Sequence, residues 1–258
     1  MKKNTINGWL FIDKPIGISS FYAVKKIRKF LNIKKIGHSG TLDPLASGVL
    51  GIAMGEATKS IDYLNDEKEY VFNITFGKSK TSEDLEGETL ETTKIIPDKK
   101  EIKEILKKFV GTIKQYPPKY SSIKIKGIRS YELARKNLNF DIKPRKVIIH
   151  ELKHIKQVNE YTHKFKTLCS SGTYIRSLGR DIALNLNSLG YISFLRRTKI
   201  FRIREKNIIS LDNLIELVHI GNHFEMVQPI ESVLDDIPAV YLNKEDTKKF
   251  RNGQMLHI

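Results

Sequence analysis

Asp43 is the best candidate for a reactive side chain in this sequence, because of the residues that surround it. It lies in segment 37–50, GHSGTLDPLASGVL, among glycines, small residues and apolar residues, with no Lys or Arg beside it. Glycines allow positive φ angles and close approach to a ligand, and Pro44 fixes the backbone next to the carboxylate. The same composition also describes an ordinary turn. The segment therefore indicates a catalytic carboxylate only if partners for it occur elsewhere in the chain.

Two further residues could act with this carboxylate. Tyr70 lies at the start of an alternating apolar pattern, and Arg176 lies in the run 169–181, CSSGTYIRSLGRD. If a helix begins at 171–173, Arg176 lies in its first turn, where the helix dipole disfavours a cation. An ion pair with a buried carboxylate would explain that position, and a pair with Asp181 is the alternative.

The elements that must position these residues follow from apolar periodicity. Strands are predicted at 9–12, 48–54, 70–76, 147–151, 165–169, 192–195 and 200–203, and helices at 20–31, 56–64, 99–110 and 173–186. Ser19 or Ser20 can cap the first helix, and Asp98 with Glu101 forms a capping box for the third. The uneven interleaving predicts an α+β fold with a mixed, largely antiparallel central sheet flanked by helices, not a regular βαβ winding.

The chain is strongly basic. It holds 45 Lys and Arg against 29 Asp and Glu, a net charge of +16 over 258 residues. Such a surface suits a polyanion, nucleic acid above all, and an AT-rich genome that supplies Lys at solvated positions is the alternative source of the charge. This length can bury one large core, with or without a small appendage.

Several classes of protein are disfavoured. The single Cys169 excludes an intramolecular disulfide, and neither an apolar run long enough for a membrane span nor a signal peptide is present, so a cytoplasmic protein is expected. Phosphate-loop, dinucleotide-binding, G-x-S-x-G and H-E-x-x-H motifs are missing from the sequence. His150 and His154 lack a convincing third ligand, so we expect no metal site.

Segment 37–50 closely resembles the catalytic motif of the bacterial tRNA pseudouridine-55 synthase family, the TruB type. Further segments resemble that family in its order: 13–20 (DKPIGISS), 55–59 with 68–70, 115–135, 172–178 and 195–198. Ordered motifs spread over about residues 8 to 200 are a specific signal. The resemblance implies the pseudouridine synthase catalytic fold.

By this resemblance the chain is an isomerase that converts the T-loop uridine of tRNA to pseudouridine. The base is flipped out, its C–N glycosidic bond breaks and a C–C bond forms. Asp43 is the implied catalytic residue, either as a nucleophile or as a stabiliser of charge on the sugar. No cofactor or metal is implied. The expected partner is the T-arm stem-loop of tRNA, with no membrane and no obligatory protein partner, so a monomer is expected.

The family also implies a set of substrate-binding residues. Arg176 would hold the catalytic carboxylate ionised and oriented. Tyr70 would stack on the uracil, Tyr174 and Leu195 would line an apolar pocket, and His38 would enter the space that the flipped base leaves. Lys14 would shape the wall of the site, and an exposed lysine beside a turn proline is the alternative.

The expected domains are a catalytic domain at 1–235, with an RNA-gripping insertion at about 115–145, and a segment at 236–258 that resembles the opening of the family's small C-terminal RNA-binding module. This truncated segment is too short for a core of its own, so we expect a short strand and helix docked on the catalytic domain. Segment 77–87 departs from the family, with Lys80 where an acid is usual, which puts a polar network there in doubt.

Two rival functions stay open. One is an RNA-guided pseudouridine synthase subunit, against which segment 117–120, PPKY, and the missing C-terminal module count. The other is an RNA chaperone without turnover, which the joint presence of Asp43, Tyr70 and Arg176 disfavours.

Overall fold

The computed structural model describes residues 6–64, 67–136, 138–220, 223–234 and 237–256. The strands are β1 Gly8–Lys14, β2 Ile36–His38, β3 Ala46–Met54, β4 Lys68–Phe76, β5 Lys78–Lys80, β6 Thr89–Thr92, β7 Gly111–Gln115, β8 Lys124–Ile125, β9 Ile128–Arg129, β10 Arg145–Asn159, β11 Thr162–Cys169, β12 Gly190–Ile200, β13 Ile203–Arg204 and β14 Ile209–Ser210. The α-helices are α1 Ser20–Phe30, α2 Lys99–Leu106, α3 Ser130–Arg135, α4 Ile175–Asn185, α5 Leu211–Ile220 and α6 Lys244–Arg251. Short 3₁₀ helices are η1 Gly55–Leu64, η2 Lys107–Phe109, η3 Glu205–Asn207, η4 His223–Met226 and η5 Ile230–Val233.

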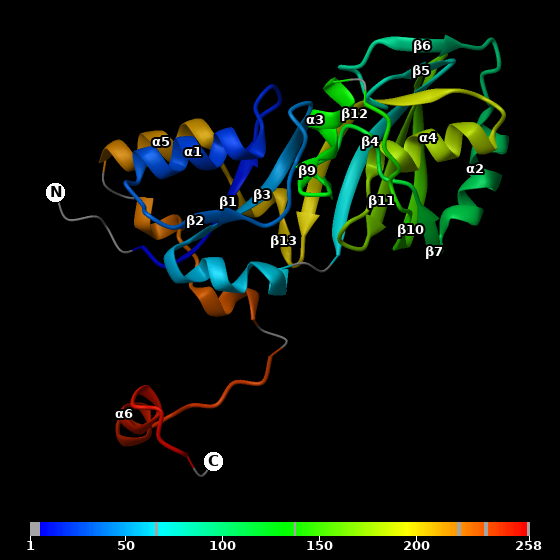
Figure 1. Cartoon of the computed structure of the whole chain (residues 1–258). Coiled ribbons are helices and arrows are strands. Elements are labelled where there is room, and N and C mark those ends of the chain that lie inside the picture. The colour runs from blue at the N-terminus through cyan, green and yellow to red at the C-terminus, as the bar shows by residue number, and fades with distance from the viewer. Residues whose placement is uncertain (1–5, 65–66, 137, 221–222, 235–236, 257–258) are drawn as a thin grey trace.

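One mixed sheet organises the described part of the chain (Figure 1). Its strand order is β14-β1-β3-β12-β4-β11-β10-β7, with β2 on β3 and β13 on β12. The β3–β12 and β1–β14 pairs are parallel, and the other pairs are antiparallel. The predicted α+β class with a largely antiparallel sheet is confirmed.

The core lies at the middle of this sheet. Strand β3 is an almost uninterrupted run of apolar and small residues and is buried at every position, as a strand with neighbours on both edges and cover on both faces should be. After its first three residues, strand β4 alternates between half-buried and buried side chains, with Phe72, Ile74 and Phe76 buried. Helix α4 packs on β12 and β4, and α2 packs on β10 and α4.

The predicted helix caps are present in the structure. Ser19 caps α1 by accepting a hydrogen bond from the backbone of Tyr22, and Asp98 with Glu101 forms the predicted capping box of α2. The predicted strand at 192–195 is part of the longer β12, whereas the predicted strand at 200–203 is wrong: Ile200 ends β12, residues 201–202 form a turn, and Ile203 begins the antiparallel β13. The predicted helix at 99–110 is α-helical only as far as Leu106; η2 follows it, and Gly111 begins β7.

The expected docking of the C-terminal segment is wrong. Residues 237–243 form no strand, and α6 buries none of its residues. Figure 1 shows α6 well apart from the sheet. The physical reason lies in its sequence, KEDTKKFR, whose single large apolar side chain, Phe250, stays 66% exposed. One aromatic ring does not make the apolar stripe that a docked helix needs.

Candidate active site

A cavity of about 510 Å³ opens where β4 begins, between the turn that precedes β3 and the segment that leads into α4. Five of the residues predicted for the site line it: Asp43, Tyr70, Tyr174, Arg176 and Leu195. They come from four separate segments of the chain, which the sheet order β3-β12-β4-β11 brings together, because one segment precedes β3, two lie in β12 and β4, and the fourth follows β11. The volume lies in the range of sites for small organic ligands, and a single nucleoside is of that size class.

Asp43 and Arg176 form an ion pair at the wall of this cavity. Nη2 of Arg176 donates to Oδ1 of Asp43 at 3.2 Å, and Nε lies 3.0 Å from Oδ2, without hydrogen-bond geometry. Arg176 is only 5% exposed, whereas a third of the Asp43 side chain faces solvent. The carboxylate can therefore meet a ligand while the guanidinium holds it from behind.

Arg176 is fixed by further partners. Its Nη1 donates to the carbonyl of Ser82 at 3.1 Å and lies 3.6 Å from Oδ2 of Asp84, and its Nη2 donates to the carbonyl of Tyr120 at 2.9 Å. Helix α4 begins at Ile175, so this cation does lie in the first turn, and two carboxylates offset the unfavourable helix dipole. The alternative pair with Asp181 does not form, because Arg180 binds that residue at 2.8 Å.

The doubt about segment 77–87 is not supported, because that segment supplies part of the polar network. Asp84 is buried against Arg176, and burial raises the pKa of its carboxyl group. Glu83 pairs with Arg180 and accepts a hydrogen bond from Ser177 at 3.3 Å. The reasoning from sequence missed both acids. The available signal was an adjacent Glu and Asp in a strongly basic chain, three residues before Gly87.

The turn that carries Asp43 is held by backbone hydrogen bonds. Ser20 at the start of α1 both accepts from the backbone of Leu42 at 2.8 Å and donates to its carbonyl at 3.0 Å. The backbone NH of Gly17 donates to the carbonyl of Pro44 at 2.8 Å, and that of Ala46 donates to the carbonyl of Asp43 at 3.0 Å. These contacts attach the turn to β3 and to α1, which explains why the 13–20 motif accompanies the Asp43 motif.

Tyr70 forms the floor of the cavity beside Leu195. Its ring is buried, and burial raises the pKa of its phenol, so the hydroxyl is neutral and can donate a hydrogen bond. Its cross-strand partner is Arg197, a fully buried cation that donates to the carbonyls of Val49 at 2.8 Å and Gly40 at 3.2 Å. The sequence analysis had placed Arg197 in a motif without giving it a role. The structure makes it the link between β3, β12 and the Asp43 segment.

Two predicted residues do not line the cavity. Lys14 is buried and donates to the carbonyls of Pro15 at 2.8 Å and Ile18 at 2.6 Å, so the alternative of an exposed lysine is wrong. Burial lowers its pKa to about 8, although Asp43 opposes that shift. His38 ends β2, outside the cavity lining. Burial and then Arg197 lower the pKa of its imidazole, which favours the neutral ring.

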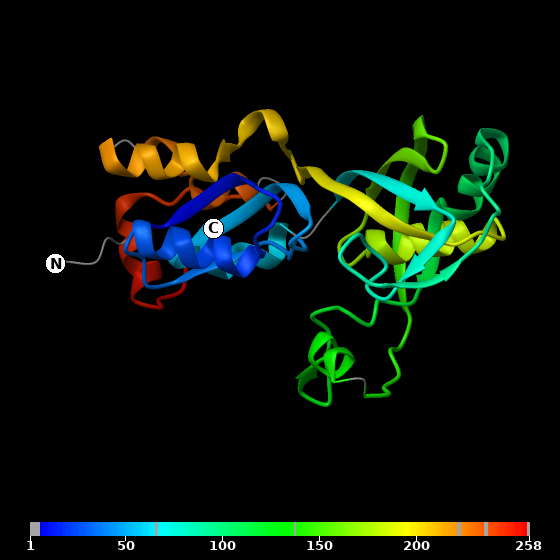
Figure 2. The same ribbon diagram turned by 90° about the horizontal axis from the view of Figure 1, so that it is seen from above.

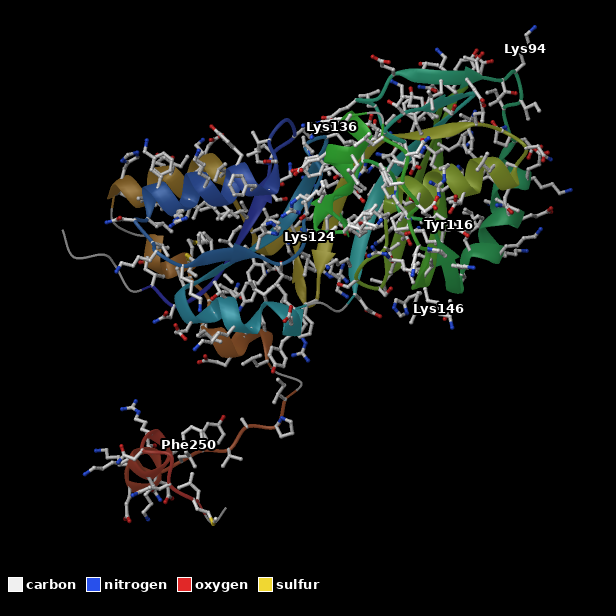
Figure 3. All side chains as sticks on the ribbon, in the orientation of Figure 1. Lys94, Tyr116, Lys124, Lys136, Lys146 and Phe250 are labelled. Carbon is white, nitrogen blue, oxygen red and sulfur yellow. The ribbon has the colours of Figure 1, made fainter. Side chains whose placement is uncertain are left out.

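Hydrogen bonds from the end of β7 hold the residue that precedes α4. Gln115 accepts from the backbone of Tyr174 at 2.8 Å and donates to its carbonyl at 3.1 Å, and the Arg145 guanidinium lies over the Tyr174 ring at 5.1 Å. Between Gln115 and Arg145 the chain projects from the sheet as a separate lobe with β8, β9 and α3, green in Figure 2. Lys124 and Lys136, labelled in Figure 3, are exposed side chains of this lobe.

Among the described residues, no three His, Cys, Asp or Glu side chains are grouped so that they could hold a metal ion. His150 lies 3.7 Å from Glu67, and His154 hydrogen-bonds to His163 at 3.0 Å. In the same described ranges, no helix has both the length and the apolar character to cross a membrane.

The fold and the site define a class of protein, the pseudouridine synthases. A solved structure of a Cbf5-Nop10-Gar1 complex matches 95% of this chain and 67% of its own, with a TM-score of 0.73 and 27% identity. A structure of an H/ACA RNP bound to a substrate RNA containing 2′-deoxyuridine matches 96% of this chain and 67% of its own, with a TM-score of 0.72 and 26% identity.

Residues 28–175 match the family model described as TruB family pseudouridylate synthase, N-terminal domain. The tRNA pseudouridine synthase B of Caulobacter sp. (strain K31) is 40% identical over 257 residues, which cover 99% of this chain and 83% of the relative. The tRNA pseudouridine synthase B of Ehrlichia ruminantium (strain Gardel) is 40% identical over 256 residues, which cover 97% of this chain and 86% of the relative. The chain belongs to the TruB family of pseudouridylate synthases. It is an isomerase that makes pseudouridine.

Proposed function

We propose that this enzyme acts on the T-loop uridine at position 55 of tRNA, and that Asp43 is its catalytic residue. The observation that carries the proposal is the Asp43–Arg176 ion pair at the wall of the 510 Å³ cavity that Tyr70 and Leu195 also line. The relatives with 40% identity are named as synthases of tRNA pseudouridine, which favours tRNA over a guide-dependent substrate.

The conversion exchanges one glycosidic bond for another. The bond from C1′ of the ribose to N1 of uracil breaks, and C1′ joins C5 after the base has turned. C5 then loses a proton and N1 gains one, so the product is an isomer of the uridine. A carboxylate beside the sugar serves this exchange as a nucleophile or by stabilising positive charge on the ribose. Asp43 has the exposure and the fixed direction that either role requires.

The other residues of the cavity have roles that follow from their surroundings. Tyr70 presents a buried, neutral phenol on which a flat base can stack. Tyr174 and Leu195 complete an apolar wall, and Arg176 orients the carboxylate. His38, whose neutral ring is favoured by burial, fills the place of the flipped base in the RNA loop. Lys14 supports the site from within the protein, because its ammonium holds segment 15–18 next to Pro44.

The lobe at 115–145 binds the RNA backbone. Exposed cations on it, among them Lys124 and Lys136 in Figure 3, suit phosphate contacts that position RNA without reading sequence. Residues 1–235 form the catalytic domain of this proposal, and 236–258 form a segment related to the C-terminal RNA-binding module. The enzyme acts as a monomer in this proposal, without an obligatory protein partner. The cytoplasm, where tRNA is available, is its expected place.

The test uses the purified full chain and an unmodified T-arm hairpin. Pseudouridine should form with the wild type and with Asp62→Asn, an exposed carboxylate on η1 that serves as control, and should not form with Asp43→Asn. Product from Asp43→Asn would refute the role of Asp43. Refolding of the hairpin without product would favour an RNA chaperone. A requirement for an added guide RNA would favour the RNA-guided class.

A further inference from the structure

The outer face of α1 combines an exposed aromatic ring with a row of cations. Phe21, Lys25, Arg28 and Lys29 are spaced as i, i+4, i+7 and i+8, so they share one side of the helix, and all four are exposed. We call these four residues the outer face. Helix α1 contains no acidic residue that could neutralise it. The opposite side, with Ser20, Ala23 and Ile27, is buried and fixes this orientation.

Phe21 is one of three exposed apolar side chains where the chain enters α1, and we call these three residues the apolar patch. Phe21 is 74% exposed, and its neighbours Tyr22 and Ile16 are 52% and 59% exposed. A single exposed apolar side chain is ordinary, but three within the seven residues that lead into and begin α1 indicate a contact surface. The helix dipole accounts for Arg28 and Lys29 in the last turn, but not for Lys25 or for the aromatic rings.

This patch is attached to the catalytic turn. Ser20, the residue before Phe21, makes two hydrogen bonds to the backbone of Leu42, and Gly17 donates to the carbonyl of Pro44. Asp43 lies between those two residues, so a ligand that docks at Phe21 docks in a fixed relation to the cavity.

The cations extend away from the site. Lys29 lies eight positions after Phe21 in the α-helix, a distance of about 12 Å along the axis. Figures 1 and 2 show that α1 runs away from the lobe at 115–145, with both on the same side of strands β1 and β3. An RNA arm held by that lobe at the cavity therefore does not cover the far end of α1.

We propose that the outer face of α1 binds a second segment of the substrate RNA, one that lies outside the T arm. Phe21 stacks on an unpaired base, and the three cations bind phosphates of the same strand. This combination of an aromatic platform and a basic track is how proteins hold single-stranded RNA without reading its sequence. The charge of the helix selects a polyanion over a protein or an apolar ligand. The inference rests on the proposed tRNA substrate.

The test measures the affinity of the full chain for an unmodified tRNA transcript and for the isolated T-arm hairpin. Phe21→Ala should weaken tRNA binding at least about 5-fold, the loss expected for one stacked base, and leave hairpin binding unchanged. Phe21→Trp should restore tRNA binding. Tyr161→Ala is the control, because Tyr161 is an exposed aromatic residue at the β10–β11 turn, at the opposite end of β4 from Tyr70, and should change neither affinity.

The cations are tested by the dependence of tRNA affinity on salt. Replacing the three cations of the outer face by Ala should lower the slope of log K against log salt by about 2, since each phosphate contact of a single strand contributes about 0.7. The control removes the same charge from three exposed lysines of α2, Lys99, Lys100 and Lys103. That control should leave the slope unchanged.

Equal tRNA binding by Phe21→Ala and the wild type would overturn the inference, as would equal losses with tRNA and hairpin or equal slopes for the two triple variants. Pseudouridine formation at saturating tRNA is recorded for each protein. Phe21→Ala should keep the wild-type rate there, because the residue acts on binding alone. If the wild type makes no product, the proposed function fails, while the affinities still decide whether α1 binds RNA.

Discussion

Gly48 offers a test of how β3 and β12 are joined beside the site. Its φ is +105°, and a Cβ atom there would lie 2.1 Å from the carbonyl oxygen of Arg197 and 2.9 Å from two further backbone atoms. Ordinary contacts between such atoms are about 3.5 Å, so Gly48→Ala forces β12 away from β3 by more than about 1 Å. Backbone atoms cannot yield as a flexible side chain does.

Gly48→Ala lowers the unfolding free energy in two ways, through backbone strain and through the clash with β12. A second glycine of the chain, Gly111, separates these two contributions. A non-glycine residue in this region of φ costs about 1–3 kcal/mol, and an overpacked contact adds about 1–3 kcal/mol, so Gly48→Ala should lose about 2–6 kcal/mol of unfolding free energy. Gly111 has nearly the same φ, +99°, and nothing within 4 Å of its added Cβ. Gly111→Ala should therefore lose only the first part.

The assay is urea denaturation followed by circular dichroism, with the two variants and the wild type at one temperature. Gly48→Ala should be the less stable variant by at least about 1 kcal/mol. It should also lose activity, because Arg197 carries the contact to Gly40 at the site. Equal stabilities within about 0.5 kcal/mol would refute the reasoning, since the clash would then cost nothing.

Three further outcomes are expected. Arg176→Lys should slow pseudouridine formation about 100-fold in single-turnover assays with little change in RNA affinity, because one ammonium cannot hold Asp43 together with two carbonyls. Asp98→Ala should lower the unfolding free energy by about 1 kcal/mol in urea, because it removes the capping box of α2. Burial lowers the pKa of His154 from 6.5 to about 4, so the unfolded chain binds that proton first, and the unfolding free energy should fall as the pH decreases from 6.5 to 4. In urea titrations across that range, His154→Gln should show a smaller fall, and an equal fall would contradict this origin.

Much of the site could be predicted because its residues lie in local motifs. The glycines and Pro44 around Asp43 and the unfavourable place of Arg176 in a helix are properties of a few adjacent residues. Asp84 was missed because nothing near it in the sequence shows that it will be buried beside a guanidinium more than 90 residues away. Lys14 and His38 were identified by resemblance, and their positions outside the cavity follow from the way β1 and β2 pack.

The periodic elements, the helix caps, the basic surface and the family can be read from residue types at short spacing, without coordinates. The packed chain was needed to show which strands are neighbours, that α6 stays undocked, and that Arg176 bridges Asp43, Asp84 and the backbone of the 115–145 lobe. The physical reason is that ion pairs and burial depend on distances between remote segments. Those distances are set by how the sheet and the helices pack around the core, and no local sequence pattern encodes that packing.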